Sequence, residues 1–293
     1  MCDNDSLDDM IEYQLRTGMS RRQFGALTVG AGVVSLMPRA VVGAEVDVTE
    51  SEVDIKTPDG TADAYFVAPA KGSHPGVLMW PDIFGLRPAF KQMAKRLAQS
   101  GYAVVVVNPF YRTQRAPTAP EHPDFNDPPT RTALMNLAST LTPTRVVTDA
   151  TAFVGWLDTQ PPVNKKRKMG TMGYCMSGGF TLRAAAAFPD RIGAGASFHG
   201  GSLVTDKPDS PHLLIPKIRA HFLIAIAEND DKRQPEAKDV LREAFAKANV
   251  PAEIEVYAGT LHGWCPIDSQ VYNHDQAERA WSRLLVLFKS TLA

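Results

Sequence analysis

Short apolar runs alternate with amphipathic stretches along the chain from residue 76 onward. The apolar runs are bounded by turn residues and predict buried strands over 76–80, 102–107, 168–173, 192–198, 221–227 and 254–257. The stretches between them show helical periodicity over 89–100, 145–157, 178–188, 235–248 and 275–292. Strand–helix alternation of this kind predicts one α/β domain, with a mostly parallel central sheet and helices on both faces.

Two further segments do not follow this alternation. Residues 46–55 and 62–67 alternate polar and apolar positions on either side of Pro58-Asp59-Gly60, which predicts an antiparallel pair at the edge of the sheet. Residues 109–143 are rich in proline and polar side chains and are long for a simple connection. We expect that segment to form a lid or cap over the functional site.

The first 44 residues have the parts of a secretion signal. Arg21-Arg22 precedes an apolar run over 25–37, and small residues follow up to Val42-Gly43-Ala44. The run is too short to cross about 30 Å of hydrocarbon, so we expect no stable membrane anchor. The sequence therefore predicts a twin-arginine signal peptide over 1–44 and a mature α/β domain over 45–293. The twin-arginine export machinery would deliver that domain to the periplasm or outside the cell. The alternative is a surface helix that happens to contain an arginine pair.

Charge and cysteine content exclude several classes of protein. Lys and Arg total 31 against 32 Asp and Glu, which gives a formal net charge of −1. A balance of this kind provides no basic field to recruit nucleic acid. The chain has 3 cysteines, which are too few for a disulfide scaffold and lack the spacing of a zinc site, so we expect no metal.

Cys175 lies where a predicted strand turns into a predicted helix, within Gly-Tyr-Cys-Met-Ser-Gly-Gly. Functional groups of parallel sheets collect at the carboxyl ends of the strands. Small residues on both sides are typical of the sharp elbow that presents a nucleophile, and the following helix N-terminus favours a thiolate. The alternatives are an inert buried cysteine and a nucleophilic Ser177. Ser177 lies two residues into the helix, and we interpret it as a packing residue.

Two acids and a histidine follow two later strands. Asp230 and Asp231 follow the strand that ends at residue 227, and His262 follows the last strand within Leu-His-Gly-Trp. A nucleophile, an acid and a histidine in this order are typical of α/β-hydrolases. His262 would act as the base and one aspartate would orient its ring. The two acids could instead cap the helix that follows, and His199 is a weaker candidate for the base.

These motifs resemble those of the dienelactone hydrolases, or carboxymethylenebutenolidases. The resemblance also includes Trp-Pro-Asp-Ile-Phe-Gly-Leu at 80–86 and Asn-Pro-Phe-Tyr-Arg at 108–112, and it covers roughly residues 50 to 290. It implies an α/β-hydrolase fold that cleaves a small ester or lactone, with no metal or organic cofactor. The reaction would use a thiolate and an acyl-enzyme.

The resemblance also assigns roles to individual residues. Cys175 would be the nucleophile, Asp230 the orienting acid and His262 the base. Asp230 is preferred to Asp231 because it aligns with the acid of the family. The backbone N–H groups of Ile83 and Met176 would form the oxyanion hole.

The substrate side departs from the family pattern. We expect four residues to bind substrate: Asp82, Tyr111, Arg112 and Trp264. Asp82 stands where the type enzymes have a glutamate that interacts with the resting cysteine, and it is one methylene shorter. Pro266 occupies the position of an arginine that holds the substrate carboxylate, while a second such arginine falls near Arg112 or Arg115. This difference predicts an ester or lactone other than a dienelactone.

A competing hypothesis is a catalytically silent ligand-binding or thiol-redox protein on a hydrolase scaffold. Cys265 lies three residues after His262 and could form a reversible disulfide with Cys175. Such a bond requires Cα atoms no more than about 7 Å apart. The alternative for Cys265 is an inert, half-buried thiol.

Overall fold

An eight-stranded sheet organises residues 46–121 and 123–292, the part of the chain that the computed structural model describes. The predicted signal peptide, residues 1–44, lies outside the described residues. The strand order is β1-β2-β4-β3-β5-β6-β7-β8. The strands are β1 (Val48–Thr57), β2 (Gly60–Pro69), β3 (Gly76–Trp80), β4 (Ala103–Val107), β5 (Met169–Tyr174), β6 (Ile192–Phe198), β7 (His221–Ala227) and β8 (Ala252–Tyr257).

The predicted antiparallel pair forms the edge of the sheet. β1 and β2 pair from Val48 opposite Pro69 to Thr57 opposite Gly60, and β2 pairs antiparallel with β4. Gly60 has φ 138°, a conformation that residues with a Cβ rarely adopt, which explains a glycine at this tight connection. The remaining strand pairs, from β4 through β3 to β8, are parallel.

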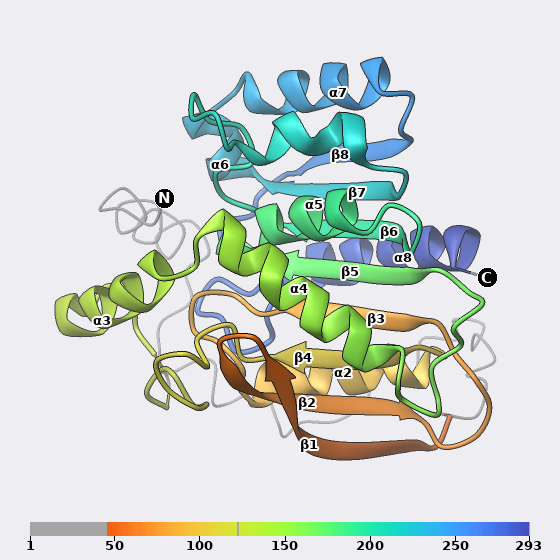
Figure 1. The fold of residues 1–293 in the computed structure, drawn as a ribbon. Coiled ribbons are helices and arrows are strands. Elements are labelled where there is room, and N and C mark those ends of the chain that lie inside the picture. Colours follow the sequence, from red (N-terminus) through yellow and green to blue (C-terminus); the bar gives the residue numbers. More distant parts are fainter. Residues whose placement is uncertain (1–45, 122, 293) are drawn as a thin grey trace, which may run out of the picture. The chain divides into compact units, whose positions relative to one another are not determined.

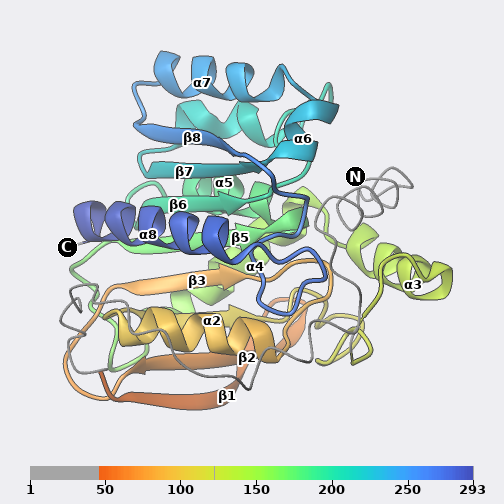
Figure 2. The same cartoon turned by 180° about the vertical axis from the view of Figure 1, so that it is seen from behind.

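Helices cover both faces of the parallel strands, which explains the continuous apolar runs (Figures 1 and 2). One face carries α2 (Pro88–Gln99) and α8 (His274–Thr291), and its core includes Phe90 and Trp281. The other carries α4 (Pro143–Leu157), α5 (Gly178–Ala187) and α7 (Ala237–Lys247), with Phe153 and Phe245 in its core. The α/β-hydrolase arrangement expected from the sequence is confirmed. Within the described residues, no helix has the length and apolar character needed to cross a bilayer.

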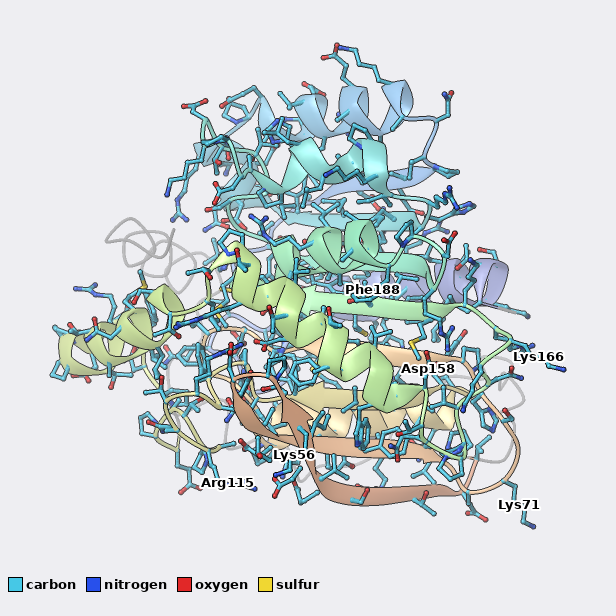
Figure 3. All side chains as sticks on the ribbon, viewed as in Figure 1. Lys56, Lys71, Arg115, Asp158, Lys166 and Phe188 are labelled. Atoms are coloured by element: carbon cyan, nitrogen blue, oxygen red, sulfur yellow. The ribbon has the colours of Figure 1, made fainter. Side chains whose placement is uncertain are left out.

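The direction of strand addition reverses at β3. The chain passes from β3 through α2 to β4 on one side, and later returns to β5 on the other side of β3. Loops that leave such a switch point diverge at the carboxyl ends of the strands, where ligands of open α/β sheets bind. In Figure 3, Lys71 and Lys166 lie at the opposite end of the sheet from α3.

The segment 109–143 contains a helix that the sequence did not predict. α3 (Pro128–Ser139) lies beyond the carboxyl ends of the central strands in Figures 1 and 2. Only Leu134 and Leu137 of α3 are buried, and this sparse apolar pattern explains why its periodicity is weak. The start of the segment is fixed to β2, because Asp63 accepts hydrogen bonds from the Asn108 side chain at 2.9 Å and from the Ala116 N–H at 2.8 Å. A lid function for α3 stays a prediction.

Candidate active site

Cys175 occupies a strained turn between β5 and α5. It begins a single 3-10 turn, Cys175–Ser177, and has φ 55°, the left-handed region that is costly for a residue with a Cβ. The neighbouring glycines allow this turn. A Cβ at Gly173 would lie 2.3 Å from the Ser177 carbonyl oxygen, and one at Gly178 would lie 2.4 Å from the Ser197 hydroxyl. The structure therefore has the strand–elbow–helix geometry expected around Cys175.

The elbow is tied to the loop that follows β3. Ser177 is fully buried, and its hydroxyl donates to the Pro81 carbonyl oxygen at 2.5 Å. On the other side, the Gly201 N–H donates to the Cys175 carbonyl oxygen at 3.2 Å. Ser177 thus serves as a buried connection between two loops, in agreement with its interpretation as a packing residue. The hydrogen bond between Ser177 and Pro81 brings the loop that contains Ile83 close to the turn that contains Met176.

His262 and Asp230 contact each other directly. The Nδ1 atom of His262 lies 2.7 Å from the Asp230 carboxylate, which belongs to the short helix α6 (Glu228–Arg233) after β7. Asp231 instead accepts a hydrogen bond from the Lys238 ammonium at 2.7 Å. Of the two adjacent acids, Asp230 is therefore the one that can hold the imidazole in one tautomer.

Asn229 fixes the backbone of the histidine loop. Its side-chain oxygen accepts a hydrogen bond from the His262 N–H at 2.8 Å, and only 6% of the residue is exposed. Sequence patterns do not identify this role, because an asparagine beside two acids matches no motif. The strand end at Ala227 was the only available signal. Asn229 and Asp230 together anchor both the backbone and the ring of His262.

A second histidine packs against the first. His199 follows β6 with φ 41° and is 1% exposed, and its ring centroid lies 5.1 Å from that of His262 in an edge-on contact. Burial lowers the pKa of His199 well below its ordinary value, and the nearby His262 lowers it further. His199 is therefore neutral at neutral pH, and its ring packs against the ring of His262.

Trp264 also packs against this cluster, with its ring centroid 6.4 Å from that of His199. It is 0% exposed and stacks on Tyr257 with 4.7 Å between ring centroids. A side chain covered to this extent cannot contact a bound molecule in this conformation. Contact of Trp264 with substrate therefore stays a prediction, and in this conformation its bulk supports the loop that carries His262.

Asp82 organises the loop proposed to hold the oxyanion. Its carboxylate accepts the Phe84 N–H at 2.9 Å, and its carbonyl oxygen accepts the Gly85 N–H at 3.0 Å. Gly85 has φ 77°, and a Cβ there would lie 2.2 Å from the Thr118 hydroxyl. Ile83 lies inside this turn and is 4% exposed. The Asp82 carboxylate also pairs with the buried Arg87 at 2.6 Å, so its contacts are those of a loop-stabilising residue.

A family model and several known proteins match this chain. The model of the dienelactone hydrolase family matches residues 62–292. The chain belongs to the dienelactone hydrolase family. It is accordingly a hydrolase that acts on ester or lactone bonds.

Relatives match over most of their own length. A protein of Synechocystis sp., provisionally named a carboxymethylenebutenolidase, is 26% identical over 251 residues, which cover 84% of this chain and 99% of that protein. The carboxymethylenebutenolidase of Rhodococcus opacus is 26% identical over 225 residues, 75% of this chain and 83% of the other. A crystal structure from Klebsiella pneumoniae, provisionally named a dienelactone hydrolase, superimposes with TM-score 0.72 at 22% identity. The superposition covers 83% of this chain and 99% of the Klebsiella chain. At 22% identity, the similarity shows a shared fold.

Arg112 of this dienelactone hydrolase family member is held between two carboxylates. Its guanidinium donates to the buried Asp149 at 2.6 and 2.8 Å and to Asp59 at 2.7 and 2.9 Å. Tyr111 donates to Asp149 at 2.8 Å and lies 2.8 Å from the Thr57 hydroxyl. These bonds connect the loop after β4 to α4 and to the β1–β2 turn. Contact of Tyr111 or Arg112 with substrate stays a prediction, and the observed pairing neutralises the arginine.

Arg115 does not supply a free cation either. It lies on the same loop and donates to Asp54 of β1 at 2.8 Å, in an exposed ion pair. Figure 3 shows Arg115 near the edge of the sheet that β1 and β2 form. An exposed pair of this kind contributes little to stability.

Neither of the two described cysteines of this family member forms a disulfide. Cys175 and Cys265 are each 6% exposed, and burial raises the pKa of Cys265 well above its ordinary value. Cys265 borders a cavity of about 220 Å³ that Tyr174 and Trp281 also line. A protonated, buried thiol reacts slowly, which favours the interpretation of Cys265 as inert. Among the described residues, no group of three His, Cys, Asp or Glu side chains could hold a metal ion.

Proposed function

We propose that this chain is an exported cysteine hydrolase that cleaves small, uncharged esters or lactones through Cys175, His262 and Asp230. The observation that carries the proposal is the 2.7 Å contact between Asp230, on α6 after β7, and His262, on the loop after β8. The strained elbow at Cys175 supports it independently. Family membership supports an ester or lactone bond as the bond that is cleaved.

The mechanism follows from these positions. The Cys175 thiolate attacks the carbonyl carbon, and His262 holds the proton that came from the thiol. The backbone N–H groups of Ile83 and Met176 would bind the oxyanion of the tetrahedral intermediate. Collapse of that intermediate expels the alcohol, which takes the proton from His262 and leaves a thioester on Cys175. His262 then removes a proton from water, the hydroxide attacks the thioester, and the acid product and the thiol are released.

The pairing of the two candidate arginines supports an uncharged acyl group. Arg87 and Arg112 each lie between two carboxylates, so each cluster has a net negative formal charge. Pro266 stands where the type enzymes have an arginine for the substrate carboxylate. A carboxylate on the substrate would therefore lack an available cation at these positions.

Matched neutral and anionic substrates test this proposal. We expect the mature protein to hydrolyse 4-nitrophenyl butyrate with kcat/KM at least about tenfold above that for the mono-4-nitrophenyl ester of succinate, a difference of roughly 1.4 kcal/mol in transition-state binding. Unsaturated five-membered lactones with and without a carboxylate form the second pair. Equal or higher kcat/KM for the anionic members would contradict the uncharged acyl group. Absence of turnover on all four would contradict the hydrolase.

The export proposal rests on residues 1–44 and has its own test. We expect Arg21-Arg22→Lys-Lys to leave the full-length protein in the cytoplasm, because the export receptor reads the arginine pair and not charge alone. Arg39→Lys, which makes the same chemical change outside the pair, is the matched control and should be exported. Cell fractionation and the mass of the exported chain give the readout. Normal processing near Ala44 in the double-lysine variant would exclude a twin-arginine signal.

A further inference from the structure

Arg87 makes a buried bridge between two carboxylates. Its Nη1 and Nη2 atoms donate to the two oxygens of Asp82 at 2.6 and 2.9 Å. Its Nε and Nη2 atoms donate to the two oxygens of Asp268 at 2.7 and 3.0 Å. The Arg87 side chain is 9% exposed, whereas that of Asp268 is 39% exposed. Paired N–H groups on each carboxylate fix the relative orientation of the three side chains.

The two carboxylates belong to the two loops on which the proposed chemistry depends. Asp82 begins the turn that contains Ile83, and its carboxylate also accepts the Phe84 N–H. Asp268 lies six residues after His262, in the loop between β8 and α8. That loop is closed by a hydrogen bond from the Asn273 N–H to the Trp264 carbonyl oxygen at 3.1 Å. Arg87 thus connects the oxyanion loop to the histidine loop, which are far apart in the sequence.

The backbone and two rings hold Arg87 in this position. It is the N-cap residue of α2 with φ −152° and ψ 171°, and Pro88 follows at the first helical position. The guanidinium lies over the rings of Phe90 and Phe84, at 4.8 and 5.4 Å from their centroids. Both contacts restrict rotation of the side chain and add cation–π attraction. The bridge is therefore a rigid connection.

Stability alone does not account for a cluster of this composition. Removing charges from water is costly, and well-packed apolar residues often stabilise a core as much as a buried ion pair does. The cluster contains one cation and two anions, so part of the negative charge is not compensated within it. A bidentate fork gives, instead, a fixed geometry between two loops that no strand pairing connects.

We propose that Arg87 is a positioning residue that holds the Ile83 N–H in register with His262 and Cys175. The inference rests on the proposed function, because it assumes that this N–H binds the oxyanion. Loss of the bridge releases the oxyanion loop, which weakens binding of the tetrahedral intermediate more than binding of the ester. The effect therefore falls on kcat and leaves KM close to the wild-type value.

Kinetics of three variants and a matched control test this role. Arg87→Met removes the bridge, Arg87→Lys keeps the charge without the fork, and Asp268→Asn weakens only the contact to the histidine loop. The control is Arg96→Met, which breaks an ion pair between α2 and α8 with Glu278 at 2.6 Å. For 4-nitrophenyl butyrate we expect kcat to fall at least tenfold in Arg87→Met and less in the other two variants. The scale for this loss is removal of a whole oxyanion-hole donor, which costs about 10²–10³ in kcat. KM should stay within about threefold of the wild-type value, and the Arg96→Met control should retain the wild-type kcat.

Alkylation of Cys175 separates positioning of the oxyanion from general disruption. Iodoacetamide reacts with the thiolate without forming an oxyanion, so its rate and pH profile should be the same in Arg87→Met and in wild type. If Arg87→Met does not fold, Arg87→Lys and Asp268→Asn decide by the same readouts. Wild-type kcat in the variants, or a parallel loss of kcat and alkylation rate, would overturn the positioning role. Absence of turnover in the wild-type protein would instead overturn the proposed function, and this inference with it.

Discussion

Cys175→Ala is expected to abolish ester hydrolysis and to leave the fold intact. The residue would supply the atom that forms the covalent bond, and the loss of one sulfur from a 6% exposed site removes little packing volume. Loss of a catalytic nucleophile reduces turnover by orders of magnitude. Cys175→Ser should also lose most of the activity, because a serine hydroxyl has a much higher pKa than a cysteine thiol and is a weaker nucleophile. Initial rates with 4-nitrophenyl butyrate measure both variants.

Cys265→Ala is the matched control for these variants. It removes the other described thiol, which is equally buried and whose pKa is raised by burial. We expect it to retain wild-type kcat/KM, and circular dichroism should show the same fold in all three proteins. If Cys175→Ala kept more than about a tenth of wild-type turnover, the assignment of the nucleophile would be wrong. A large loss in Cys265→Ala alone would favour the thiol-redox alternative.

Asp230→Asn is expected to reduce kcat by up to about 10⁴. The substitution keeps the shape of the side chain that contacts His262 Nδ1 at 2.7 Å, but an amide N–H at that position favours the wrong imidazole tautomer. His262 would then present an N–H, instead of a lone pair, for proton transfer. Stopped-flow or steady-state rates across pH 6 to 9 measure the effect.

Asp231→Asn provides the comparison at the adjacent position. Its carboxylate contacts Lys238, so we expect a change of only a few-fold in kcat. The two variants remove the same charge one residue apart, which separates orientation of His262 from the general electrostatic field. Equal losses in the two variants, or a larger loss in Asp231→Asn, would contradict the role of Asp230.

The sequence predicted most of the fold because local patterns determine it. Fully buried parallel strands such as β3, Gly-Val-Leu-Met-Trp, are continuous apolar runs, and the amphipathic helices between them have one apolar stripe. α3 and α6 were not predicted. α3 buries only two side chains, and α6 is six residues long and strongly polar, so neither has an apolar periodicity.

The candidate site was predictable where a motif lies within one segment. The glycines around Cys175 and the order of Cys175, Asp230 and His262 are visible in the sequence. Arg87 and Asp268 are separated by 181 residues, and no local pattern indicates that they meet. Likewise, the burial of Trp264 depends on Tyr257 and on the packing of the whole sheet. Pairings across loops need the folded structure.

Trapping the acyl-enzyme tests most directly the claim that Cys175 is the nucleophile. The wild-type protein is mixed with excess 4-nitrophenyl acetate, quenched in acid within the first turnovers and digested for peptide mass spectrometry. We predict one acetyl group per chain, on the peptide that contains Cys175 and on the sulfur of that residue. Ser177, two residues after Cys175, lies in the same peptide, and fragmentation distinguishes the two positions. An acetyl group on Ser177, or continued turnover by a Cys175→Ala protein with no acylated peptide, would contradict the account.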